Sequence, residues 1–144
     1  MIRNANLEDM PGLLRMAASF GAVAGLPAPL CAASMEQTFT GLMEAPLGVL
    51  LVNDEVTAAA GAVVTPAYYN LGHMTGQELF WWVDENARGG VGVRLFKTLE
   101  DEVRRLGAES FVMVALENIK PDQTSTFYLR NGYRPLERNY IRSL

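Results

Sequence analysis

The sequence has few of the residues that build cross-links or metal centres. It contains one cysteine, Cys31, and one histidine, His73, in 144 residues. A single cysteine excludes an internal disulfide and a thiolate metal cluster, and such low usage is typical of a reducing compartment. No second ligand stands at a useful spacing from His73, so we expect no metal site.

Long apolar runs and a basic surplus are missing as well. No apolar stretch approaches the roughly 18 residues of a membrane-spanning helix, and the N-terminus lacks the basic start and long apolar centre of a signal peptide. A net charge of -4 argues against a general nucleic-acid binder. We therefore expect a cytoplasmic protein without a nucleic-acid or membrane partner. A free edge strand or an aromatic surface could support a homodimer.

What is present is the composition of an ordinary globular domain. Hydrophobic residues make up 49% of the chain and charged residues 19%. At this length a single domain spanning residues 1–144 can bury a sizeable core.

Hydrophobic spacing and turn residues predict an alternation of helices and strands. The expected order is a short edge strand at 2–3, a helix to about Phe20 with Asn6 as its N-cap and Asp9 three residues on, a helix ending near 45–46, a hairpin of 48–52 and 56–64, a loop at 65–76, a strand at 77–84, a helix at 91–106, a strand at 111–116, a short helix at 123–131, and one or two closing strands within 133–144.

The strand at 77–84 is the centre of the predicted fold. Both of its alternating sets are apolar, with Phe80 and Trp82 in one and Trp81 in the other, so we expect both faces to be covered. A helix joins it to the next buried strand, and such a crossover requires a parallel pair. The predicted fold class is α/β, with a mixed, mostly antiparallel sheet and helices on both faces.

Three glycines, Gly89, Gly90 and Gly92, stand between this strand and the following helix. A glycine-rich turn at a helix N-terminus presents unpaired N–H groups to an anion, which favours phosphate binding over a plain turn. A P-loop would need Gly-Lys-Ser/Thr, which is absent. A dinucleotide fingerprint would need glycine at Leu95. A nucleotide-binding domain nevertheless remains a third alternative.

The segment from Val83 to Val93 resembles the pyrophosphate loop of the GNAT superfamily of acyl-CoA-dependent N-acetyltransferases. The opening Ile2–Met10 and the closing Asn131-Gly-Tyr133 are similar to that family too. Residues 85–86 depart from it, because proline is usual there. The resemblance implies a GNAT-like sheet whose central parallel pair splays to admit acyl-CoA, and acetyl-CoA as cosubstrate.

The resemblance also implies which residues hold coenzyme A. Backbone amides of the loop would bind its pyrophosphate, the backbone at the end of the strand would pair with its pantetheine arm, and one asparagine would make a further contact. These residues are Trp82, Val83, Arg88, Gly89, Gly90, Val91, Gly92, Val93 and Asn118.

Two residues are candidates for the proton transfers. By the resemblance, Tyr128 lies near the thioester sulfur and protonates it; the alternative is a core tyrosine. Glu78 shares the phase of Phe80 and Trp82, and its apolar surroundings should raise its pKa toward that of a base near neutrality. The alternative is a solvent-facing or salt-bridged glutamate.

An acceptor site is the least defined part of the sequence interpretation. His73 and Tyr69 are candidate acceptor contacts, although a solitary loop histidine is more often simply exposed. We expect Trp81 to be an ordinary core residue. The predicted function is transfer of acetyl from acetyl-CoA to a primary amine, directly and without an enzyme nucleophile. The alternative is a catalytically silent acyl-CoA-binding or regulatory interaction module.

Overall fold

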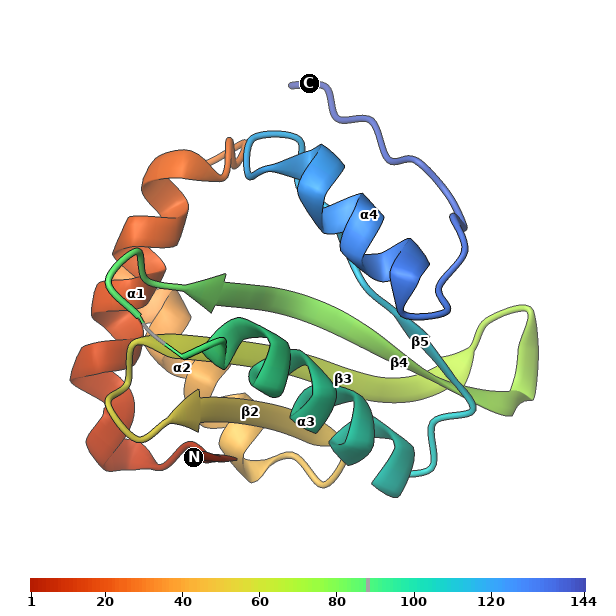
Figure 1. Ribbon diagram of the computed structural model, residues 1–144, viewed down its shortest axis with the longest axis horizontal. Helices are drawn as coiled ribbons and strands as arrows, with labels where there is room; N and C mark the ends of the chain where they lie inside the picture. The colour runs from red at the N-terminus through yellow and green to blue at the C-terminus, as the bar shows by residue number, and fades with distance from the viewer. Residues whose placement is uncertain (88) are drawn as a thin grey trace.

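The computed structural model describes residues 1–87 and 89–144. Five strands and four α-helices follow one another in the described chain (Figure 1). They are β1 (Ile2–Asn4), the 3-10 turn η1 (Leu7–Asp9), α1 (Met10–Val23), α2 (Ala32–Glu44), β2 (Gly48–Asn53), β3 (Ala58–Ala67), β4 (Asn70–Val83), α3 (Val91–Arg105), β5 (Ser110–Val112) and α4 (Pro121–Arg130).

The five strands form one mixed sheet in the order β1-β2-β3-β4-β5. Three successive pairs are antiparallel, and β4 pairs with β5 in parallel across the α3 connection. The predicted fold class is therefore confirmed, including the parallel pair. No helix in the described residues is long and apolar enough to cross a membrane.

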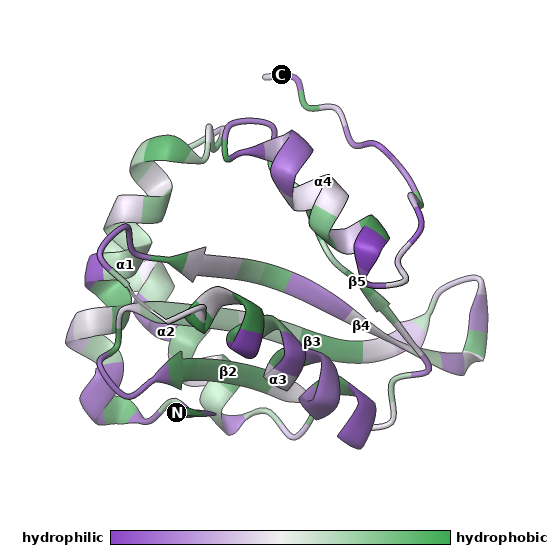
Figure 2. Cartoon of the chain, in the orientation of Figure 1, coloured by the Kyte–Doolittle hydropathy of each residue, from purple (hydrophilic) through white to green (hydrophobic). Residues whose placement is uncertain are grey.

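Helices cover both faces of this sheet, and each face has its own apolar core. On one face α3 packs over β2 and β3 through Leu95, Leu99 and Val103, all essentially inaccessible. The small side chains of β3 on this face allow the helix to approach closely. On the other face α1 and α2 pack through Leu13 and Phe39. Figure 2 shows strands β2 and β3 as largely hydrophobic and the visible side of α3 as mostly hydrophilic.

The predicted helix boundaries agree closely with the structure. The Asn6 side chain accepts a hydrogen bond from the backbone N–H of Glu8, and the Asp9 carboxylate accepts one from the backbone N–H of Asn6, which completes a capping box. At the end of α3, Gly107 takes a left-handed φ of +99°, as expected of a glycine after a helix.

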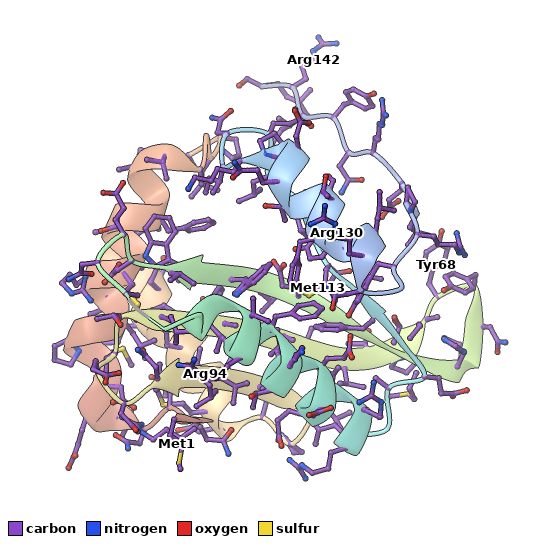
Figure 3. The ribbon with its side chains drawn as sticks, in the orientation of Figure 1. Met1, Tyr68, Arg94, Met113, Arg130 and Arg142 are labelled. Atoms are coloured by element: carbon purple, nitrogen blue, oxygen red, sulfur yellow. The ribbon has the colours of Figure 1, made fainter. Side chains whose placement is uncertain are left out.

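The predicted loop at 65–76 is wrong, because β3 runs to Ala67 and β4 begins at Asn70. Pro66 suggested a break in regular structure. The proline instead sits at a register shift between Pro66 and Ala67, where a missing N–H is tolerated. In Figure 3, Tyr68 lies at the tip of this long hairpin, at the opposite end of β4 from the turn before α3.

Two further predictions at the C-terminal end are wrong. The strand expected at 111–116 is shortened to Ser110–Val112, because its pairing with β4 stops there. Within the described part of the chain, no strand follows α4. The residues after Tyr133 are mostly exposed, and their alternation of apolar and polar residues is not matched by a sheet neighbour.

Candidate functional site

Strand β4 pairs with β3 along most of its length and with β5 only over a short stretch near its middle. Its pairing with β5 covers Thr75 to Gln77. Its pairing with β3 continues to the end of the strand at Val83. From Glu78 onward, the edge of β4 that faces away from β3 therefore has no strand partner among the described residues. Figure 1 shows β5 and the chain after it diverging from β4 toward α4.

An extra residue in β4 marks the point of divergence. Phe80 pairs with Gly61 and Glu78 pairs with Ala62, so Leu79 bulges out of the ladder. Because one added residue reverses the alternation of faces, Glu78 shares the face of Ala62, under α3. Phe80 and Trp82 pack on the α1 and α2 face. The prediction that Glu78 is in phase with them is therefore wrong.

Glu78 and Tyr128 meet at this point through one peptide segment. The Glu78 side chain is 6% exposed, and its Oε1 accepts a hydrogen bond from the backbone N–H of Val114 at 3.3 Å. The Tyr128 hydroxyl, carried by α4, donates to the carbonyl oxygen of Val114 at 2.6 Å. The two side chains thus satisfy backbone groups that the shortened β5 leaves without a strand partner.

The burial of this pair changes the pKa values of both groups. Removal from water raises the pKa of Glu78 to about 7, although the hydrogen bond from the Val114 N–H and the nearby Tyr128 hydroxyl oppose the shift. Burial also raises the pKa of the Tyr128 hydroxyl, and the neighbouring Glu78 charge raises it further. At neutral pH the carboxyl group is therefore close to half ionised and the tyrosine keeps its proton.

An aromatic cluster fixes the Tyr128 ring. Its centroid lies 6.2 Å from that of Trp81, 6.3 Å from Phe96 and 5.7 Å from Tyr133. The Tyr133 hydroxyl donates to Glu100 of α3 at 2.5 Å, which joins the end of α4 to α3. Rings from β4, α3 and α4 together hold the hydroxyl of Tyr128 beside Glu78.

The glycine turn lies at the other end of the unpaired edge. Gly89 and Gly90 have φ values of +73° and +67°, which favour glycine, and Gly90 is the N-cap of α3. No side chain caps the helix in the described residues, so its first N–H groups are free to bind an anion. A Cβ at Gly90 would meet no atom of the described residues within 4 Å. The predicted contact of Arg88 lies outside the described residues.

The remaining residues of the predicted loop have different surroundings. Val91 is 4% exposed and belongs to the α3 core, whereas Val93 is 41% exposed. A Cβ at Gly92 would lie 3.2 Å from Cγ2 of Val83, so close packing requires glycine there. The Arg94 guanidinium donates to the carbonyl oxygen of Gly89. The turn and the first helical residues thus offer backbone rather than side-chain donors.

The end of β4 is tied to α1. Asp84 accepts a hydrogen bond from Nε1 of Trp82 at 2.8 Å and forms an ion pair with Arg15 at 2.8 Å. Arg15 also donates to the carbonyl oxygen of Val56. These contacts hold the residue before the glycine turn in place from the α1 side.

Asn118, the predicted coenzyme contact, lies in the connection between β5 and α4. Its side-chain amide packs directly on Gly25 after α1, so closely that a Cβ at Gly25 would overlap it. The loop after α1 and the loop before α4 therefore touch. We retain the coenzyme contact of Asn118 as a prediction.

The two predicted acceptor contacts lie toward the other end of β4. His73 Nε2 is 2.9 Å from the Ser110 hydroxyl, and its Nδ1 is 3.7 Å from Glu109. Five residues at about 3.3 Å each place His73 roughly 16 Å from Glu78 along the strand. Tyr69 is 71% exposed at the hairpin tip and farther away. The structure thus brings Glu78 and Tyr128 together and leaves these two apart.

A cavity of about 430 Å³ lies between α3, β5 and the segment after α4, with Phe111 and Tyr133 in its wall. It is lined by neither Glu78 nor the glycine turn, and it lacks a buried titratable side chain. We place the candidate site at the unpaired edge of β4 because the buried carboxyl group with a raised pKa, Glu78, is there. No group of three potential metal-ligating side chains occurs in the described chain.

Sequence reasoning missed two parts of this arrangement. The bulge at Leu79 could not be read from an alternation that is apolar on both faces. The role of Val114 as the shared partner of Glu78 and Tyr128 depends on where β5 stops pairing, which the apolar run 111–116 conceals. No residue pattern in the sequence gives a signal for either feature.

Comparison with known proteins gives structural matches. No protein-family model and no curated protein sequence matches the chain. A transcriptional regulator from Bacillus halodurans is similar in structure, with a TM-score of 0.81, 20% identity and coverage of 100% of this chain and 99% of that one. An acetyltransferase from Trypanosoma brucei has a TM-score of 0.73 and 18% identity, covering 100% of this chain and 99% of that one.

A third similar structure is described as a predicted acetyltransferase with acetyl-CoA, from Clostridium acetobutylicum. Its TM-score is 0.75 at 16% identity, and the match covers 99% of this chain and 95% of that one. Matches of this extent, together with the mixed sheet and its diverging parallel pair, establish the architecture. The chain has the GNAT fold of the acetyltransferases.

Proposed function

We propose that this protein is an acyl-CoA-dependent N-acetyltransferase that moves acetyl from acetyl-CoA to a primary amine. One observation carries the proposal. The edge of β4 without a strand partner has a glycine-capped helix start at one end and the buried Glu78–Tyr128 pair at the other. A fold match below 25% identity does not fix an activity, so the proposal rests on the site.

The residues present fit acetyl-CoA. The first N–H groups of α3 lack a side-chain cap and suit a diphosphate, and Gly90 leaves space for it. The backbone of β4 at Val83 points away from β3, because its partner Ala58 donates to Asn53 on the β2 side, and it can pair with the amides of a pantetheine arm, as an added strand does. The thioester would then lie near Glu78 and Tyr128.

The chemistry follows from the two perturbed groups. The amine nitrogen attacks the thioester carbonyl carbon, and the Glu78 carboxylate takes the amine proton, directly or through a water molecule. A free N–H of β4 supports the negative charge on the carbonyl oxygen. As the carbon–sulfur bond breaks, the Tyr128 hydroxyl turns from Val114 and protonates the thiolate.

The coupling between Glu78 and Tyr128 orders these two proton transfers. The negative charge on Glu78 raises the pKa of Tyr128. When Glu78 takes the amine proton, that charge disappears and Tyr128 becomes a stronger acid as the thiolate leaves. The proton on Glu78 then passes to the tyrosinate, and both groups return to their starting states. Protonation of the base therefore activates the acid.

Binding and turnover can be tested separately. A ligand that binds only the folded protein at 100 times its dissociation constant stabilises it by about 2.7 kcal/mol. We expect acetyl-CoA and coenzyme A to raise the melting temperature, and ATP and NAD at equal concentration to do so less. A shift with ATP or NAD alone would support the nucleotide-binding alternative instead.

Turnover is measured as thiol release from acetyl-CoA against a panel of primary amines, including polyamines, aminoglycosides and lysine peptides. Thiol release that depends on one class of amine identifies the acceptor. Binding of acetyl-CoA without acceptor-dependent release across the panel would favour the silent acyl-CoA-binding module.

A further inference from the structure

Trp81 has a polar atom that the protein itself does not use. Its indole Nε1 is buried and has no hydrogen-bond partner among the described residues. A buried N–H without an acceptor costs roughly 1–3 kcal/mol, and nearly all such groups in native proteins are paired. An unpaired N–H at this position therefore requires an explanation.

The neighbouring tryptophan shows that this chain can pair an indole N–H. Trp82 points to the opposite face of β4, where its Nε1 donates to Asp84 at 2.8 Å. Trp81 points under α3 and α4, where its ring packs against Phe96 and Phe127. Two adjacent tryptophans thus differ in whether the fold supplies an acceptor.

The position of Trp81 links the two ends of the candidate site. Its Cζ2 lies 4.0 Å from the point where a Cβ on Gly92 would stand, in the first turn of α3. Its ring centroid lies 6.2 Å from that of Tyr128. Cζ2 is bonded to the carbon that carries Nε1, so the unpaired N–H is on the part of the ring near α3. Trp81 also belongs to the segment of β4 that lacks a second strand.

We propose that the Trp81 indole N–H donates a hydrogen bond to an oxygen of the pantetheine arm of bound acyl-CoA. This inference rests on the proposed function, because that arm joins the diphosphate at the glycine turn to the thioester beside Tyr128. An uncharged N–H suits the amide and hydroxyl oxygens of the arm. Free backbone amides at the start of α3 already provide the donors that a diphosphate needs.

The experiment removes the N–H while keeping the shape of the ring. The sequence contains two tryptophans, so a Trp82→Phe protein leaves Trp81 alone for replacement by analogues during expression. Three forms are compared in that background. They carry tryptophan, 4-fluorotryptophan, which keeps the N–H, and 3-benzothienylalanine, which has sulfur in its place.

We expect the benzothienyl form to bind acetyl-CoA about fivefold more weakly than the other two forms, the loss typical of one neutral hydrogen bond. Binding of ADP, which has the diphosphate without the arm, should be equal in all three. Trp81→Phe in the natural sequence should show the same selective loss, and Trp81 fluorescence should change when acetyl-CoA binds.

The outcomes distinguish the inference from the proposed function. Equal acetyl-CoA affinity in all three forms would overturn the role of the N–H and leave the proposed function standing. A parallel loss of ADP affinity would overturn the assignment to the pantetheine arm. If the natural protein fails to bind acetyl-CoA at all, the proposed function fails, and this inference fails with it.

Discussion

The two halves of β4 differ in their neighbours and therefore in their chemistry. The half up to Gln77 pairs with β5 at its end, over Thr75–Gln77, and its polar side chains are exposed or half-buried. There His73 contacts Ser110, whose hydroxyl donates to Thr75 at 3.0 Å. The half from Glu78 onward has a strand on one side, and its carboxyl group is buried. A side chain with an altered pKa occurs where the second strand is lost.

The comparison teaches how this fold provides a reactive group. A regular ladder satisfies its own backbone and leaves polar side chains to water. Where β5 leaves, Val114 needs partners, and Glu78 and Tyr128 provide them. The carboxyl group is thereby drawn into an apolar environment that raises its pKa. The following predictions test whether function follows this division.

The largest effect is expected from Glu78→Gln. Removing a general base typically lowers turnover by about 10²- to 10⁴-fold, and we expect a loss in that range with acetyl-CoA affinity retained. The matched control is Glu109→Gln, which changes an exposed carboxylate beside His73, just before β5. Steady-state kinetics with the best acceptor measures the turnover of both variants. Similar losses in both variants would show that the division of β4 is irrelevant to catalysis.

Glu78 also predicts a pH dependence with a definite sign. Its pKa is raised from 4.5 to about 7 on folding, so its contribution to stability is fully present below pH 4.5 and is lost as pH rises through 7. The loss is about 3 kcal/mol at 1.36 kcal/mol per pKa unit. Denaturation with urea across this range should show the decline. Glu78→Gln should remove this contribution, and a retained decline would assign it to other groups.

The next largest effect is expected from Gly90→Val. A β-branched side chain is strained at a φ of +67° and would occupy the space at the helix start. Loss of one hydrogen bond to a charged group costs about 1.5–3 kcal/mol, or roughly 10- to 150-fold in affinity. Calorimetric titration with acetyl-CoA measures this loss of affinity.

Gly107→Val is the matched control for Gly90→Val. Gly107 also has a positive φ and an open Cβ position, but it follows the end of α3. Both variants should lose stability, and Gly107→Val should keep its affinity for acetyl-CoA. Equal loss of affinity would mean that strain in α3, rather than the turn, controls binding.

A smaller effect is expected from Tyr128→Phe. A thiolate is a good leaving group, so we expect a loss of about tenfold in turnover, below the usual range for general acids. The control is Tyr133→Phe, whose ring lies 5.7 Å away and whose hydroxyl binds Glu100. That variant should lose stability and keep the chemical step. Single-turnover rates separate an effect on the chemical step from an effect on stability. Equal rates for Tyr128→Phe and the natural protein would exclude the hydroxyl as the acid.

The smallest effect is expected from His73→Ala. The imidazole lies before the stretch of β4 that pairs with β5, roughly 16 Å along the strand from Glu78 at about 3.3 Å per residue. With a small primary amine as acceptor, kcat/KM should change by less than about twofold, as for most surface substitutions. A larger change confined to long peptide acceptors would extend the acceptor site to His73, as the sequence suggested.

Much of the fold could be predicted because its signals are local. The capping residues Asn6 and Asp9 and the spacing of Leu95, Leu99 and Val103 determine where helices lie. The apolar character of both faces of β4 and the helical crossover determine the parallel pair. The glycine turn was also predictable, because positive φ values leave a direct trace in residue type.

The rest of the site depends on pairing between distant segments. The face of Glu78 is set by the extra residue Leu79, and the partners of Glu78 are set by where β5 ends. The spacing of apolar residues is a property of one strand, whereas a bulge depends on how that strand pairs with its neighbour. Periodicity in the sequence therefore does not reveal a bulge. For the same reason the alternation after Tyr133 predicted strands that have no partner in the described chain.

The bulge at Leu79 decides on which side of the sheet Glu78 lies. If Leu79 paired in a regular ladder, Glu78 would share the face of Phe80, and its carboxyl group would point to the α1 side, away from Tyr128. Deleting Leu79 would instead remove the bulge and leave Glu78 opposite Ala62, on the α3 side. Comparisons with relatives should therefore ask whether the strand carries this bulge, and not only how many residues separate the carboxylate from the glycine turn.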